Sequence, residues 1–127
     1  MKGTLDIVTT VDGQASTKTW DAICELDVHF AKIQYRDENA LVKVEIKDNL
    51  VTISRKGDYG LEMSFEEGKK TPVTLELGGN VGEILLETYR LGYLLAEKSC
   101  MLQLHYALCF SETEKQDISL RLNAKCI

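Results

Sequence analysis

Apolar and polar residues alternate along most of this chain, and this period of two constrains the fold more than any other feature. Successive side chains of a β-strand point to opposite faces, so alternation predicts strands with one buried face. The pattern is clearest in Trp20–Phe30, Cys100–Phe110 and Ile118–Cys126. We therefore predict an all-β protein of about eight to ten strands joined by short turns. The 127 residues are the size of one ordinary domain, residues 1–127.

The register of neighbouring strands can be tested on the sequence, because a one-residue slip would turn matching apolar side chains to opposite faces. Turns at 38–39 and 48–49 and loops at 56–60, 68–72 and 111–117 all place apolar residues on one shared face. A long antiparallel meander with one apolar face removes its exposed edges by closing into a barrel, which is the architecture we expect. The predicted pairs include Ile33 with Val44, Val44 with Ile53, Ile53 with Met63, Val51 with Phe65, Phe65 with Leu75, Met63 with Leu77, Tyr106 with Leu122 and Leu108 with Leu120.

Two segments depart from the simple pattern. The apolar phase changes between Phe30 and Ala31, which predicts either a β-bulge or a tight bend within Val28–Gln34. The segment Gly82–Lys98 has apolar residues at roughly helical spacing. We interpret it as a strand because Gly92 lies at its centre, where a glycine would weaken a helix.

Composition excludes several classes of function. The net charge is −5 and the pI is about 5.0, whereas nucleic-acid modules carry a basic surface, so we expect no nucleic-acid partner. An acidic chain without a long apolar segment also predicts no membrane partner. The first residues lack the apolar core of a secretory signal, and the cysteines form no CxxC pair, so we expect a cytoplasmic location with reduced thiols. The cysteines are Cys24, Cys100, Cys109 and Cys126.

Signals of catalysis or metal binding are weak. The glycine-rich GGNVG, Gly78–Gly82, lacks the lysine of a phosphate-binding loop, and we interpret it as a turn. Glu66 and Glu67 are adjacent in sequence, so on a strand they would face opposite sides and could not act as an acid/base pair. His29 and His105 occupy outward positions without other metal ligands at a suitable spacing. We expect no enzyme, no cofactor and no metal site.

Arg55 is the unusual residue of the inward-facing set. The predicted registers place Arg55 beside Val42 and Leu61, both apolar. One interpretation puts it at the barrel mouth, where its aliphatic stem covers these neighbours and its guanidinium reaches water or Asp58. The other puts it inside a cavity, where the guanidinium would bind a ligand carboxylate or phosphate in a bidentate manner.

A longer pattern surrounds Arg55. It runs from a tyrosine through V-T-I-x-R-x-G and a strand with Met and Phe to E-x-G-K, and spans Tyr35–Lys70. The pattern, with GEILLETYRLGYLL and HYALCF later in the chain, resembles the YwiB-like family of uncharacterised bacterial proteins. The resemblance implies a lipocalin-like (calycin) β-barrel and a strand at Gly82–Lys98, but no activity or site residues. The chain departs from the family pattern at Val28–Gln34 and Thr71–Gly82.

Two functional hypotheses follow. In the first, the barrel binds a small amphipathic or hydrophobic ligand, because a barrel of about eight strands can hold one small molecule. In the second, large side chains fill the interior and the protein is a non-enzymatic module that binds a partner protein through its surface. The ligand-binding residues of the first hypothesis are Arg55, near the anionic group, and Val51, Ile53, Met63, Phe65 and Tyr106.

Overall fold

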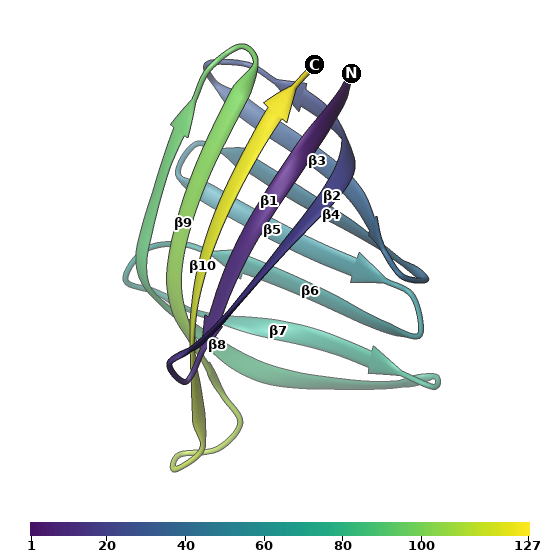
Figure 1. Ribbon diagram of the computed structural model, residues 1–127. Helices are drawn as coiled ribbons and strands as arrows, with labels where there is room; N and C mark the ends of the chain where they lie inside the picture. The colour runs from purple at the N-terminus through teal and green to yellow at the C-terminus, as the bar shows by residue number, and fades with distance from the viewer.

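The computed structural model describes residues 1–127 as one closed barrel of ten antiparallel strands (Figure 1). Each strand pairs with the next along the chain, and β1 pairs with β10 to close the sheet. The predicted all-β class and closed meander are therefore confirmed. No helix that could span a membrane is present. The strands are β1 Lys2–Val11, β2 Gln14–Leu26, β3 Phe30–Asp37, β4 Ala40–Lys47, β5 Leu50–Lys56, β6 Tyr59–Phe65, β7 Lys70–Leu77, β8 Asn80–Leu95, β9 Ser99–Cys109 and β10 Lys115–Cys126.

Two long strands, β2 and β8, form the corners of the barrel. β2 pairs with β1 along 10 residues but with β3 only through Ala22–Leu26. β8 pairs with β7 through Asn80–Glu87 and with β9 through Leu85–Leu95. Strands β1, β9 and β10 consequently run steeply across β5, β6 and β7 (Figure 1). The second half of β8 has no neighbouring strand on its β7 side.

The structure confirms three of the five predicted hairpin registers, those that join β3 to β4, β4 to β5 and β5 to β6. The predicted β6–β7 register is wrong by four residues, since Leu75 pairs with Leu61 rather than Phe65. Pro72 has no N–H to donate, and the ladder stops at Glu62 and Thr74. The Thr71 hydroxyl instead donates a hydrogen bond of 2.7 Å to the Ser64 carbonyl.

The predicted β9–β10 register is wrong by the same amount. Ile118 pairs with Tyr106 rather than Phe110, because the loop is residues 110–114. The Phe110 N–H donates to the Glu114 carbonyl at 2.9 Å, and the Ser111 hydroxyl accepts from the Glu114 N–H at 3.1 Å. Both errors shift the register by an even number of residues, so the side chains still face the predicted sides of the sheet.

The structure shows the conformation of the two irregular segments. Between β2 and β3 there is a tight bend, in which the Asp27 N–H donates to the Phe30 carbonyl at 3.0 Å and Leu26 pairs with Ala31. The segment Gly82–Lys98 is a strand, as predicted, and β8 covers most of it. A β-bulge between Thr88 and Arg90 switches its inward residues from even to odd numbers, which explains its mixed pattern.

The interior of the barrel is a single apolar core. Twenty-three buried residues form one contiguous cluster, which Trp20, Tyr35, Leu61 and other half-buried residues border. The largest fully buried side chains are Phe65, Leu5, Ile33, Ile46, Leu86, Leu102 and Leu122.

Candidate functional site

The five apolar residues predicted to contact a ligand all lie in the core. Val51 and Phe65 are 0% exposed, and Ile53, Met63 and Tyr106 are at most 8% exposed. The Phe65 and Tyr106 rings meet edge to face with their centroids 4.8 Å apart. Burial raises the pKa of the Tyr106 phenol to about 12. These side chains are brought together, as predicted, but as members of the packed cluster.

Arg55 lies at the rim of the barrel, beside Val42 and Leu61 as predicted. Its Nη2 donates to Asp58 Oδ1 at 2.9 Å and its Nη1 donates to the Tyr59 carbonyl at 2.8 Å. Its guanidinium carbon also lies 3.7 Å from the centroid of the Tyr59 ring. The hydrogen bond with Asp58 raises the pKa of Arg55 and lowers that of Asp58. The guanidinium is thus held by its own β5–β6 turn, which agrees with the mouth interpretation.

A groove of about 580 Å³ lies on the outside of the barrel, across β1, β8, β9 and β10. We call it the β8–β10 groove. Gly92 contributes to its hollow, because no atom lies within 4 Å of where a Cβ would stand on this residue. The outward-facing residues of these four strands that line it are Val8, Thr10, Arg90, Gly92, Gln103, His105, Ser119 and Arg121.

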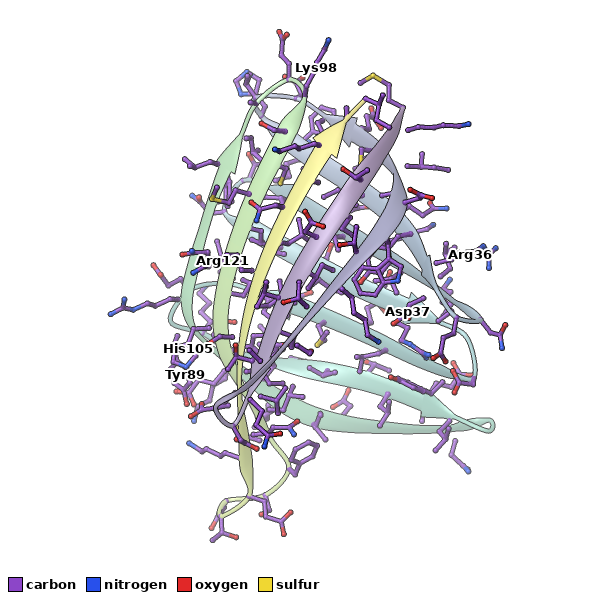
Figure 2. All side chains as sticks on the ribbon, in the orientation of Figure 1. Arg36, Asp37, Tyr89, Lys98, His105 and Arg121 are labelled. Carbon is purple, nitrogen blue, oxygen red and sulfur yellow. The ribbon has the colours of Figure 1, made fainter.

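Two arginines line the β8–β10 groove, although the whole chain carries a net charge of −5. Arg90 and Arg121 are exposed, and neither makes an ion pair or a side-chain hydrogen bond within the protein. His105 Nε2 lies 4.0 Å from Asp117 Oδ1. The Tyr89 ring lies against the His105 ring, with centroids 5.1 Å apart (Figure 2). The groove therefore offers two unpaired guanidinium groups.

One carboxylate lies in the same groove, and the fold explains its position. Glu67 belongs to the β6–β7 turn, beside the part of β8 that β7 does not reach. Its Oε1 accepts a hydrogen bond of 3.1 Å from the Leu91 N–H. This bond satisfies a backbone donor on the open edge of β8. Glu67 thus has a structural partner, whereas the two arginines have none.

The strand register sets the spacing of the arginines. Arg90 pairs with His105 across β8 and β9, and Arg121 pairs with Gln103 across β10 and β9. The two arginines are therefore two strands and two residues apart, or roughly 12 Å between Cα atoms at ordinary strand spacings. An extended arginine side chain spans about half that distance. Both guanidinium groups can reach one ligand lying over β9, between His105 and Gln103.

The sequence prediction missed this groove for an identifiable reason. Its β9–β10 loop, residues 111–117, would place Arg121 opposite Ala107 instead of Gln103. That shift moves Arg121 to the opposite side of His105, away from Gln103 and Gly92. The sequence did predict that His105 and its neighbours face outward. These positions form a site only when the correct register brings β8, β9 and β10 together.

Other chemical groups do not form a site. No group of three His, Cys, Asp or Glu side chains is placed to hold a metal ion. All four cysteines are free thiols. Burial raises the pKa of Cys24 and of Cys100 to about 11, so both thiols stay protonated near neutral pH. A protonated buried thiol is a poor nucleophile.

Comparisons with known proteins place the chain in a family. A family model described as a domain of unknown function, DUF1934, matches residues 8–122. The crystal structure of the ywiB protein from Bacillus subtilis is similar, with a TM-score of 0.71, 13% sequence identity, and coverage of 98% of this chain and 90% of that chain. At this identity the likeness concerns the fold alone. No curated protein matches the sequence.

Proposed function

The chain belongs to the DUF1934 family, and we propose that it is a non-enzymatic binding module whose outer surface recognises a partner protein. The observation that carries this proposal is the filled interior. A barrel of this kind either packs its inside with side chains or keeps room for one small ligand. Here Val51, Phe65 and Leu102 are all 0% exposed and share one core cluster.

Polarity inside the barrel supports the same proposal. Ligand pockets combine apolar walls with a few convergent polar groups that orient the ligand. The buried core contains one polar residue, Thr88, whose hydroxyl has no hydrogen-bond partner. Arg55, the other candidate, already uses its guanidinium on Asp58 and Tyr59. An anionic head group at Arg55 would have to compete with the Asp58 carboxylate.

The outer surface offers what the interior lacks. The β8–β10 groove combines open space, exposed guanidinium groups on Arg90 and Arg121, and the polar side chains of Gln103 and Ser119. Arginine is enriched where proteins meet, because its planar fork binds partner groups with defined geometry. We therefore place the recognition surface at this groove.

Native mass spectrometry of gently purified protein tests the filled interior. We expect one mass, that of the chain, under native and denaturing conditions. An additional mass that is lost on denaturation would overturn the proposal. It would favour the alternative function, a small amphipathic ligand inside the barrel near Arg55.

Site-specific photocrosslinking in the cells that produce the protein tests the outer surface. A photoreactive residue at Gln103 lies in the β8–β10 groove, and one at exposed Lys43 on β4 is the matched control. We expect a discrete protein adduct from Gln103 and none from Lys43. Equal adducts from both positions, or none from Gln103, would contradict recognition at this groove.

A further inference from the structure

We propose that the β8–β10 groove binds an extended acidic peptide segment, with Arg90 and Arg121 each holding one carboxylate. This inference rests on the proposed function and specifies the partner's chemistry. Both arginines are exposed and unpaired, and they lie on β8 and β10, with Gln103 and His105 of β9 between them. An unpaired guanidinium presents several N–H donors in a plane that matches a carboxylate.

The spacing favours an extended peptide with carboxylates two residues apart. Side chains at positions i and i+2 of an extended chain lie on one face, roughly 7 Å apart. The Arg90 and Arg121 Cα atoms are roughly 12 Å apart by strand geometry. Each guanidinium needs to lean only a few ångströms inward to meet one carboxylate. A compact single anion would need both side chains to extend to the midpoint, whereas two carboxylates let each arginine bind nearer its own strand.

The remaining groove residues suit a peptide backbone. Gln103, Ser119 and Thr10 provide neutral donors and acceptors along the groove, which runs across four strands. Four strands span roughly 14 Å, the length of about four extended residues. Gly92 has no side chain, so a peptide can approach the β8 backbone closely. The groove thus offers two charges, with Gln103 between them and Ser119 and Thr10 beyond β9.

The negative charges of the groove limit where the peptide can lie. Glu67 sits at the β8 side and is bonded to the Leu91 N–H, and Asp117 lies 4.0 Å from His105. Both would repel an acidic peptide. The favourable path therefore runs between Arg90 and Arg121 across β9, over Gln103. The acidic remainder of the chain also disfavours long polyanions, which would extend beyond the groove.

The test is a titration of ¹⁵N-labelled protein with acetyl-Glu-Ala-Glu-Ala-Glu-amide, followed by amide chemical shifts. We expect saturable shifts centred on Gly92, Gln103 and Arg121. The double variant R90Q/R121Q should bind about tenfold more weakly, as expected for the loss of two exposed charge pairs. Binding should also weaken as the salt concentration is raised from about 0.01 M to about 0.15 M, because the Debye length falls from about 30 Å to about 8 Å and charges are screened more strongly.

Arg36→Gln is the matched control. Arg36 is exposed on β3, away from the groove and on the other side of the barrel from Arg121 (Figure 2). This variant should bind the peptide as the unchanged protein does. Equal weakening by Arg36→Gln would mean non-specific charge attraction and would overturn the inference. A Gln-Ala-Gln-Ala-Gln peptide that binds equally well would also overturn it.

Inorganic phosphate is the second probe. If phosphate alone displaced the peptide at low concentration and shifted the same amides, the groove would be an anion site for phosphate and the peptide assignment would be wrong. If no probe bound while Gln103 still crosslinked a partner, the acidic-peptide inference would fail and the proposed function would stand. A small molecule found inside the barrel would contradict the proposed function whatever the peptide did.

Discussion

Phe65 on β6 and Tyr106 on β9 meet across the interior of the barrel, edge to face, with ring centroids 4.8 Å apart and planes inclined by 69°. Their strands are not neighbours, since β7 and β8 lie between them. The contact therefore joins, through the interior, two strands that are three places apart in the barrel. Both side chains are at most 5% exposed.

This contact predicts a large effect of truncation. Phe65→Ala should lower the free energy of unfolding by about 3–5 kcal/mol, since it removes a buried ring and leaves a cavity. Phe65→Leu keeps most of the volume and should cost clearly less. Urea denaturation of both variants is the measurement. A loss below about 1 kcal/mol for Phe65→Ala would show that the ring is not tightly packed, and would favour room for a ligand.

Thr88 and Thr71 predict opposite outcomes for the same substitution. The Thr88 hydroxyl is fully buried without a partner, so Thr88→Val should raise the free energy of unfolding by about 1–2 kcal/mol. The Thr71 hydroxyl donates to the Ser64 carbonyl, so Thr71→Val should lower it by about 1 kcal/mol. Urea denaturation distinguishes them. A destabilising Thr88→Val would mean that the hydroxyl has a bonding partner, such as a buried water.

The sequence predicted the face of the sheet to which each side chain points better than it predicted the register of neighbouring strands. Alternation determines parity, because a one-residue slip exposes the apolar set. A slip of four residues leaves parity unchanged, so Leu75 could pair with Leu61 or Phe65 on the same face. The β6–β7 register depended on the turn at Pro72, and the β9–β10 register depended on the turn at Ser111. Both turns act through local hydrogen bonds that alternation does not reveal. The interior was therefore predictable, whereas the β8–β10 groove, which needs correct pairing of three strands, was not.

Arg55 predicts a small effect on stability. Its guanidinium is tied to Asp58, whose side chain is 74% exposed, so water can replace the pair when it is lost. Arg55→Leu should leave the thermal midpoint close to that of the unchanged protein, and far above that of Phe65→Ala. Asp58→Asn removes the same ion pair from the other side and should have a similar small effect. Failure of Arg55→Leu to fold would mean that the guanidinium stabilises the barrel as a buried group.

The buried thiols and phenols predict a loss of stability at high pH. Burial raises the pKa of Cys24 and Cys100 to about 11, and that of Tyr35 and Tyr106 to about 12, from ordinary values of 9.0 and 10.0. Above pH 9 the unfolded chain therefore releases protons that the folded chain retains. The free energy of unfolding should be fully present below pH 9 and fall as pH rises towards 12.

Tyr106→Phe isolates one part of this alkaline loss. With a pKa of 10.0 in the unfolded chain and about 12 in the folded chain, the Tyr106 phenol accounts for about 2 kcal/mol of the stability lost between pH 9 and pH 12, so this variant should lose about that much less. Urea denaturation at several pH values measures the difference, and Tyr89→Phe, at an exposed position, is the matched control. If Tyr106→Phe followed the same alkaline profile as the unchanged protein, the Tyr106 phenol would have to reach water freely. The centre of the barrel would then be open to solvent, contrary to the packing that Phe65 and Tyr106 define.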